Sequence, residues 1–477
     1  MNLKNITRFV PSTLCLLTVA LMLLVSLQSI RLVVPVQPLY GTFDDPVKPQ
    51  LSYTDFCSGV WQAQVDKYLR QTHGFREPAI RLYNQYQWSL FGQSPVPQVV
   101  LGRNQYLFEP YVVEDYYESR MYKYTNSPEE LLRRFDIESQ RLAKIQAILA
   151  QYGTHLFVVC WPSKDHIYPQ YLPSRGNLTR PKGPTAIDNY PPLFAQYGIP
   201  CINYCSYIEQ RRDSLPYYFF PQMGTHWSTI AATYAFDSVM RYMRQNTSCL
   251  IPQVVLGNPY SDYTRYPDAD LSQMMNLIRL PHPRREQYVD VHLAPGQSAI
   301  PRSQRPGLIV IGDSFFKNIN LAFPLDSLFR YCHYWYYNST IHYDSLYDNT
   351  NQIDLVAQLL DADIVMLAYC SGQLYDLGVN TLQSARNFTT QALVQLCFDT
   401  DRIQQTIDDI CSRIRSDQSW FERLQRKAEQ QSRTIDEVVV DDAEYLLFTQ
   451  PEEFFPELAL PGIPTSRSSR IANAIHQ

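Results

Sequence analysis

Three short runs of apolar residues, at positions 156–160, 308–311 and 364–367, constrain the fold of this chain more than any other feature. Each run is continuous rather than alternating, which is typical of a strand buried on both faces of a parallel sheet. Segments with a helical spacing of apolar residues separate the runs, one beginning after Ser127 and others over about 229–243 and 353–360. Helices that alternate with buried strands predict an α/β three-layer sandwich with a parallel sheet, whose ligands bind at the carboxyl ends of the strands.

A candidate nucleophile lies at that edge of the predicted sheet. Ser314 follows the run at 308–311 as the last residue of a Gly-Asp-Ser sequence, and a serine on a tight turn after a buried strand is exposed for attack. His226, within the sequence Thr-His-Trp, can serve as its distant base. A Gly-Asp-Ser sequence is weak evidence alone, because such residues usually mark a turn. The pair therefore needs support from further segments.

The segment from residue 9 to residue 30 contains no charged residue and can supply the roughly 20 residues that a membrane helix needs. Lys4 and Arg8 precede it, and Asp44 and Asp45 follow it. The positive-inside rule then predicts a cytoplasmic tail (1–8), a transmembrane signal anchor (9–30) and a linker (31–55) that leads into an extracytoplasmic remainder. The alternative is a cleaved signal peptide, but the apolar run is long and no clear small-x-small cleavage site follows it.

Charge and cysteine content exclude some classes of function. The net charge is -5 and no long run of Lys or Arg occurs, so nucleic acid is not an expected partner. Of ten cysteines, nine lie outside the anchor, an odd number that cannot all pair internally. Cys160 and Cys370 lie in or beside apolar runs and are expected to be buried thiols, while Cys201 and Cys205 lack a second Cys/His pair. The sequence leaves room for one disulfide and indicates neither a metal site nor a cofactor.

The pattern changes after about residue 399 to helices without strands. Ile403, Ile407, Ile410 and Ile414 have helical spacing, and two further apolar faces follow. We therefore predict a helical C-terminal region over 399–477 and assign it no chemistry.

Several segments, in a specific order, carry a resemblance to a known family. They are Gly74-Phe75-Arg76-Glu77, residues 99–108, Trp161-Pro162-Ser163-Lys164 with Tyr168 and Leu172-Pro173, Thr225-His226-Trp227, and residues 311–315. The chain resembles the AlgJ/AlgX-type SGNH-hydrolase-like proteins, periplasmic O-acetyltransferases of exopolysaccharides such as alginate. The histidine precedes the serine, which is similar to this family's permuted order. The resemblance runs from about residue 74 to 378 and implies an SGNH-hydrolase-like domain over 56–398.

What the resemblance implies is acetyl transfer through the serine. Ser314 would accept an acetyl group from a membrane-bound O-acyltransferase and pass it to a hydroxyl of an exported polysaccharide, with His226 as general base in both half-reactions. Backbone N–H groups near Ser314 would stabilise the oxyanion, with Asn318, Tyr369 or Gln373 as further candidates from their positions in the sequence. The resemblance also suggests three substrate-binding side chains and a location in the inner membrane, single-pass, with the main domain in the periplasm. These three side chains are Lys164, Tyr168 and Trp227.

One position departs from the family's pattern. The family has an aspartate two residues before the histidine, where this chain has Gly224. Asp165, Asp313 or a backbone carbonyl could orient the imidazole instead. Two alternatives therefore stay open: a catalytically inactive carbohydrate-binding or scaffold subunit of an acetylation complex, and an SGNH carbohydrate esterase.

Overall fold

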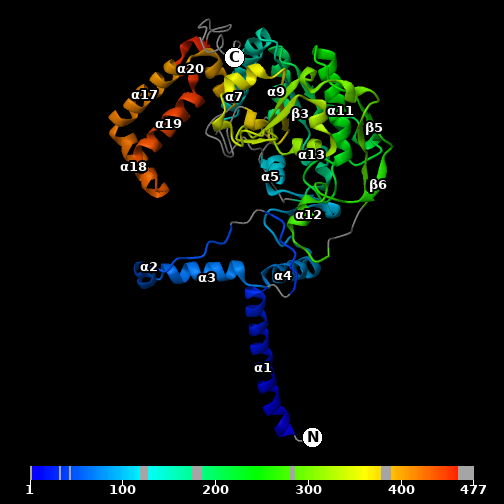
Figure 1. Cartoon of the computed structure of the whole chain (residues 1–477), viewed down its shortest axis with the longest axis vertical. Coiled ribbons are helices and arrows are strands. Elements are labelled where there is room, and N and C mark those ends of the chain that lie inside the picture. Colours follow the sequence, from blue (N-terminus) through cyan, green and yellow to red (C-terminus); the bar gives the residue numbers. More distant parts are fainter. Residues whose placement is uncertain are drawn as a thin grey trace. The chain divides into compact units, whose positions relative to one another are not determined.

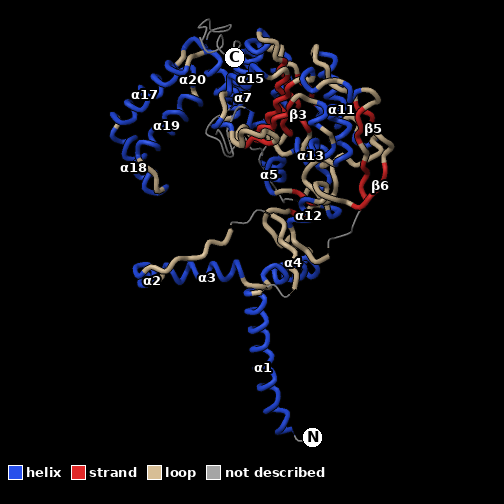
Figure 2. Tube along the Cα trace, viewed as in Figure 1, coloured by secondary structure: helices blue, strands red, loops and turns tan. Residues whose placement is uncertain are grey.

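The computed structural model describes residues 3–31, 34–41, 45–118, 127–174, 185–279, 285–377 and 388–459, without the side chains of residues 3–12, 14 and 376. Parts of the expected linker and the end of the expected C-terminal region, residues 460–477, lie outside this range. The chain forms two compact units. The first contains the chain up to Pro110, with Gln222–Gly224 and Ala269–Arg284, and the second contains the rest. The first unit includes residues 56–110, and the helices and strands of both units are drawn in Figures 1 and 2.

The first unit is mainly helical. Its helices are α1 (Leu3–Ile30), α2 (Tyr53–Ser58), α3 (Val60–Thr72), α4 (Arg76–Phe91) and α12 (Asp270–Met274), and its strands β1 (Val100–Leu101) and β2 (Leu107–Phe108) form an antiparallel hairpin. A small core holds the hairpin to α12 and consists of Val99, Leu107, Met223, Leu271, Met275 and Leu277. Within the described part of the chain, no helix is both long and apolar enough to cross a membrane, so the anchor expected over 9–30 gains no support.

The second unit is built around one central sheet. Its strands lie in the order β11-β10-β9-β12-β3-β4. They are β3 (His155–Trp161), β4 (Cys201–Asn203), β9 (Gly307–Gly312), β10 (Tyr331–Tyr336), β11 (Thr340–His342) and β12 (Ile364–Cys370). All neighbours are parallel except β10 and β11, which are antiparallel. The expectation of a parallel sheet is therefore corrected to a mixed sheet, because a short hairpin joins β10 to β11 and reverses the chain.

Four further strands form two antiparallel pairs in the second unit. These are β5 (Val254–Leu256) with β8 (Val291–Leu293), and β6 (Tyr260–Tyr263) with β7 (Arg285–Tyr288). Short 3-10 helices complete the connections: η1 (Arg103–Gln105), η2 (Pro169–Tyr171), η3 (Arg212–Ser214), η4 (Gln297–Ala299), η5 (Arg302–Gln304), η6 (Thr350–Gln352), η7 (Leu374–Leu377) and η8 (Pro456–Ala459).

Helices cover both faces of the central sheet, as the sequence predicted. On one face Val158, Ile309 and Leu367 pack against α7 (Pro128–Gln151), α9 (Ala186–Gln196), α15 (Leu355–Asp361) and α16 (Phe388–Cys397). On the other face lie α11 (Thr229–Asn246) and α13 (Phe315–Ala322), whose rings contact Phe157 and Tyr334 (Figure 1). Shorter helices are α5 (Pro110–Glu118), α8 (Lys164–Ile167), α10 (Tyr204–Glu209) and α14 (Leu325–Leu328). The α/β three-layer sandwich is thus confirmed.

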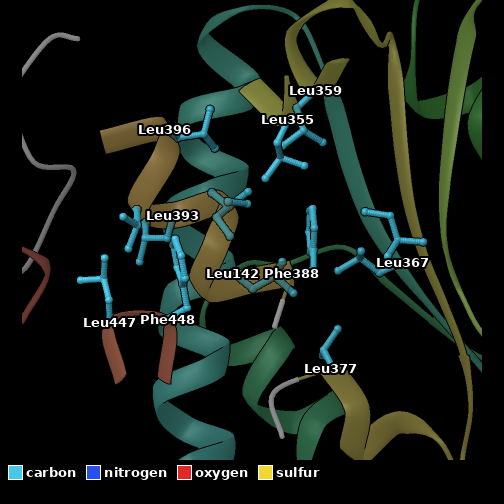
Figure 3. Close-up of a cluster of buried hydrophobic side chains, with 14 of the residues drawn as sticks. Leu142, Leu355, Leu359, Leu367, Leu377, Phe388, Leu393, Leu396, Leu447 and Phe448 are labelled. Carbon is cyan, nitrogen blue, oxygen red and sulfur yellow. The ribbon is translucent and has the colours of Figure 1, made fainter. Parts of the chain in front are cut away.

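The C-terminal helices share the core of the sheet's α7 face. They are α17 (Thr400–Ser416), α18 (Gln418–Gln431), α19 (Ile435–Thr449) and α20 (Pro451–Phe454), and no strand occurs among the described residues after 399. Figure 3 shows Leu447 of α19 in one buried cluster with Leu393 of α16, Leu142 of α7 and Leu367 of β12. The region is helical, as expected, but it belongs to the same compact unit as the sheet.

The cysteines are free thiols throughout. Cys160 and Cys370 are buried, as predicted. The Sγ atoms of Cys160 and Cys201 lie 3.9 Å apart, well beyond the length of a disulfide bond.

Candidate active site

The turn after β9 is fixed by a glycine and a buried aspartate. A Cβ at Gly312 would lie 2.0 Å from the backbone oxygen of Ala368, so only glycine lets β9 and β12 approach here. The carboxylate of Asp313 accepts hydrogen bonds from the backbone N–H groups of Phe315 (3.0 Å) and Cys370 (2.6 Å). The first bond starts α13, and the second ties the turn to the end of β12. Ser314 is therefore held between a strand end and a helix start.

Asp313 has no exposed surface, and this affects the pKa of its carboxyl group. Burial raises the pKa of the carboxyl, while the two backbone N–H groups and the nearby His226 lower it by smaller amounts. The aspartate thus interacts electrostatically with the histidine while both of its oxygens brace the backbone.

The histidine segment is held by contacts from several elements. Ser228 caps α11, since its Oγ accepts from the Ala231 N–H (3.3 Å) and donates to the Tyr218 carbonyl (2.8 Å). The Trp227 indole Nε1 donates to the Phe315 carbonyl (3.1 Å), and the Asn318 side chain donates to the Trp227 carbonyl (2.9 Å). Two hydrogen bonds therefore lock the residue after His226 onto α13, the helix that begins after Ser314.

These two segments bring the predicted pair together. His226 Nε2 lies 2.8 Å from Ser314 Oγ, and both side chains are partly exposed. The ring of His226 also packs edge-on against Phe315, with centroids 5.2 Å apart. A nucleophile and a base at this distance can exchange a proton. The backbone N–H of Ser314 has no acceptor among the described residues, which suits it to an oxyanion at the attacked carbon.

Asp268 anchors the start of α11 from a distant part of the chain. Its Oδ1 accepts from the N–H (2.9 Å) and the hydroxyl (3.1 Å) of Thr229, three residues after His226. Burial raises the pKa of this carboxyl to about 7, against the lowering effect of the Thr229 donors. Sequence reasoning missed Asp268, because it lies 39 residues from its partner and no local pattern connects them.

The other strand ends are tied together by serines. Ser371, after β12, accepts at Oγ from the Ser163 N–H (3.0 Å), and the two hydroxyl oxygens lie 2.6 Å apart. Asp165, which the sequence offered as an orienting group, accepts from the Ser163 hydroxyl (2.6 Å). Asp165 thus takes part in the link between β3 and β12.

Several residues expected at the site are instead enclosed by protein. Lys164 is 1% exposed, Tyr168 is 7% exposed and Trp227 is 0% exposed, so these side chains offer little surface to a bound sugar. Tyr168 Oη accepts from the Phe219 N–H (3.1 Å) and supports the segment before the histidine. The burial of these three residues gives no support to their expected substrate-binding role, which stays a prediction.

Asn318 and Tyr369, two of the candidate oxyanion donors, are also buried. The Asn318 side-chain amide donates its hydrogen bond to the Trp227 carbonyl, and the residue is 1% exposed. Asn318 therefore positions the histidine segment. Tyr369 is 3% exposed and packs in the hydrophobic cluster on the α7 face of the sheet.

Comparison with known proteins supports the family resemblance. Residues 116–328 match the family model described as the SGNH hydrolase-like domain of the acetyltransferase AlgX. No curated protein matches the chain.

Solved structures with similarity to the chain include three proteins. The O-acetyltransferase domain of Pseudomonas putida AlgJ is 15% identical, with 65% of this chain and 98% of that chain covered and a TM-score of 0.38. Pseudomonas aeruginosa AlgX is 12% identical (60% and 68% covered, TM-score 0.36), and Bacillus cereus PatB1 is 12% identical (58% and 96% covered, TM-score 0.35). At these TM-scores, the family assignment rests on the sequence match. The resemblance inferred from the sequence is thereby confirmed over residues 116–328, which match the model of the AlgX-type SGNH hydrolase-like domain.

Proposed function

We propose that this protein is an O-acetyltransferase that carries an acetyl group on Ser314 and passes it to a hydroxyl of an exported polysaccharide. The observation that carries the proposal is the 2.8 Å contact between His226 Nε2 and Ser314 Oγ, with both side chains accessible. The match of residues 116–328 to an acetyltransferase domain supports it.

The first half-reaction loads the serine. Ser314 Oγ attacks the carbonyl carbon of the donor's acetyl ester while His226 Nε2 accepts the hydroxyl proton. The oxygen of the tetrahedral intermediate becomes negative and receives a hydrogen bond from the Ser314 N–H. When the intermediate collapses, the bond to the donor's alcohol breaks, and His226 returns the proton to that leaving group.

The second half-reaction transfers the acetyl group from Ser314 to the acceptor. A sugar hydroxyl attacks the acetyl-serine carbonyl and gives its proton to His226, and the Ser314 oxygen leaves and takes that proton back. Atoms and protons balance, so the enzyme returns to its starting state with no other reactant. Water in place of the sugar would make the protein an esterase.

In this proposal, several groups together orient the His226 imidazole. Gly224 offers no carboxylate, whereas the carboxyl group of Asp313 lies close enough to His226 to interact with it electrostatically. The hydrogen bonds to Trp227 and the anchoring of Thr229 restrain the backbone on the other side. Asp313, Asn318 and Asp268 are positioning residues, since they act through the pair and not on the substrate.

The cellular setting is proposed from the sequence. The uncharged segment 9–30, with Lys4 and Arg8 before it, would anchor the chain in the inner membrane and place the main domain in the periplasm. A membrane-bound O-acyltransferase would supply the acetyl groups there. A reporter that is active only outside the cytoplasm, fused after residue 477, should be active; an inactive fusion would overturn this topology.

Transfer to an acceptor tests the function. The parent protein, given an activated acetyl ester and an oligosaccharide, should produce acetylated sugar, and Ser314→Ala should abolish the product. Acetate without acetylated sugar would favour the esterase. If the parent protein reacts with no donor that is tried, the inactive sugar-binding subunit is favoured. The absence of a carboxylate at Gly224 supports that alternative.

A further inference from the structure

Helix α4 of the first unit keeps its charged residues on the side that packs against protein. These residues are Arg76, Glu77 and Arg81, and each of them is half-buried. The Arg76 guanidinium lies 3.5 Å from the Glu77 carboxylate, and Arg81 Nη2 donates to the Pro38 carbonyl (2.8 Å). The charges of α4 therefore interact with groups of the first unit.

Polar side chains hold the same side of α4 to the rest of the first unit. The buried Asn84 side chain donates to the Met275 carbonyl (2.8 Å), and Gln85 Oε1 accepts from the Arg279 N–H (2.8 Å). Trp88 packs, partly buried, against the small core that contains Met275. The protein-facing side of α4 is thus rich in polar groups, which is the reverse of the pattern in an ordinary surface helix.

The opposite side of α4 is apolar and exposed. Five large side chains lie there at helical spacing, each at least half exposed, and no charged residue of α4 is exposed between them. A contiguous exposed apolar patch of this kind marks an interaction surface. We call it the α4 face, and it consists of Leu82 (64% exposed), Tyr83, Tyr86 (50%), Leu90 (66%) and Phe91.

The neighbouring helix α3 has the surface that water favours. Its Asp66 and Arg70 form an ion pair of 2.8 Å with side chains that are 59% and 79% exposed, and Lys67 is exposed beside them. The α4 face has no such groups. Leucines and tyrosines without a charge are instead typical of the boundary between the headgroups and the acyl chains of a bilayer.

The start of α4 is packed against the last turn of α1. The Gly74 N–H donates to Ser29 Oγ (2.8 Å), and a Cβ at Gly74 would lie 2.5 Å from the backbone of Gln28. Apolar side chains of α1 are exposed up to that turn, with Leu27 at 51% and Ile30 at 85%. The exposed apolar surface of α1 and the α4 face are therefore connected within the first unit, and one bilayer can contact both.

We propose that the α4 face lies in the headgroup region of a phospholipid bilayer, next to the end of α1. Lipid is the partner that fits an uncharged face of leucine and tyrosine adjoining a second exposed apolar surface. The first unit is then held to the membrane at two places, α1 and α4, so that α1 alone does not fix its orientation. The inference rests on the membrane setting of the proposed function but not on acetyl transfer.

Photocrosslinking from the α4 face identifies what covers it. The full-length protein, with p-benzoylphenylalanine in place of Tyr86, is reconstituted into vesicles of phosphatidylethanolamine and phosphatidylglycerol, irradiated and digested for peptide mass measurement. The control carries the same probe in place of Tyr445, an exposed tyrosine of α19 in the second unit (51% exposed). Phospholipid adducts should be at least about fivefold more abundant at position 86 than at position 445.

Acidic substitutions on the α4 face should remove these adducts. With the probe at position 86, Leu82→Asp together with Leu90→Asp should lower the yield of phospholipid adduct about tenfold or more, because carboxylates resist leaving water. The matched control combines Leu132→Asp of α7 with Val440→Asp of α19, which replaces exposed apolar residues of the second unit and should leave the yield unchanged. Circular dichroism confirms that each variant is folded.

Three results would overturn the α4 face as a lipid-binding surface. They are adducts that join two copies of the chain in place of lipid, equal phospholipid adducts at positions 86 and 445, and a yield that the two aspartates on α4 do not change. A full-length protein that does not float with the vesicles would overturn the membrane setting and the α4 face together.

Acetylation of Ser314 in the same vesicles separates this proposal from acetyl transfer. If the probe at position 86 captures phospholipid but an activated acetyl ester never labels Ser314, the proposed reaction fails and the α4 face stands. If Ser314 is labelled but the probe captures no phospholipid, the proposed reaction stands and the α4 face fails.

Discussion

The two segments that meet at the candidate active site are held in different ways. Ser314 follows a buried strand, and its turn is braced mainly from within, by the adjacent Asp313 carboxylate and a glycine packed on β12. His226 lies in a loop whose position depends on remote partners: Asn318 on α13 and Asp268, near the end of a long connection. The nucleophile is thus placed by the strand order of the sheet, and the base is placed by side-chain hydrogen bonds across the fold.

This difference predicts different costs for disturbing each segment. A change at the nucleophile's turn disturbs the sheet itself and should appear as lost stability. A substitution at a residue that holds the histidine segment should reduce the transfer rate by more than the loss of folded protein accounts for. The reason is that small displacements of a catalytic group lower the rate steeply.

The largest expected effect comes from removing the base. His226→Ala should lower acetyl transfer about 10³-fold or more, since Ser314 would lack a proton acceptor. Transfer rates and circular dichroism of the purified variant check this. His292→Ala, which removes an exposed histidine of β8, should match the parent; equal rates for the parent and His226→Ala would remove the histidine from the mechanism.

The next largest effect tests how tightly the nucleophile's turn is packed. Gly312→Ala places a Cβ against the Ala368 backbone oxygen and should lower the free energy of unfolding by about 3 kcal/mol or more. Chemical denaturation measures it. At Gly257 an added Cβ meets its nearest atom at 3.6 Å, so Gly257→Ala is the matched control with little expected loss. Equal stability for both variants would contradict the close approach of β9 and β12.

Loosening the histidine segment should have a smaller effect on folding than on catalysis. Asn318→Ala removes the hydrogen bond to the Trp227 carbonyl and should cost about 2 kcal/mol of stability. Transfer should fall at least about tenfold at a temperature where the variant is fully folded. Asn246→Ala, at the exposed end of α11, controls for loss of an asparagine. A variant with reduced stability but parental kcat would show that this brace supports folding alone.

The last expected effect is a pH dependence from Asp268. Its folded pKa of about 7 lies above the usual value, so its contribution to stability is fully present below the unfolded pKa and is lost as the pH rises through about 7. The neighbouring groups are Thr229 of α11 and Glu286 and Tyr288 of β7. Between pH 5 and 7, the free energy of unfolding should fall by up to about 1.4 kcal/mol per pH unit from this group.

Asp268→Asn should flatten that decline, because an amide does not titrate. Denaturation at several pH values, with the exposed Asp348→Asn as control, measures the slope. The same slope in all three proteins would mean that Asp268 ionises as an ordinary surface carboxyl does.

The buried strands could be predicted from the sequence because their residues are apolar on both faces. The runs at 156–160, 308–311 and 364–367 became β3, β9 and β12. The antiparallel β11 was missed, since the hairpin before it uses Tyr337 and Asn338 in left-handed conformations without a glycine to mark the turn.

The candidate active site could be predicted only in part, because only some of its residues have a local signal in the sequence. Ser314 has a local signal, the buried strand before it, and His226 was found through the order of family segments. Burial depends on neighbours from elsewhere in the chain, so the resemblance placed Lys164 and Trp227 on the substrate side, whereas both side chains are enclosed by protein. Asp268 carries no motif at all, and only the fold brings it to Thr229, next to the histidine segment.

Locating the acetyl group on the protein tests the central claim most directly. The full-length parent, Ser314→Ala and His226→Ala proteins are incubated briefly with an activated acetyl ester, quenched in acid and digested for peptide mass measurement. We predict an acetyl adduct on the peptide that contains Ser314 in the parent, none on that peptide in Ser314→Ala, and far slower labelling in His226→Ala. Undiminished labelling at another residue in Ser314→Ala, with no adduct on Ser314 in the parent, would contradict the account.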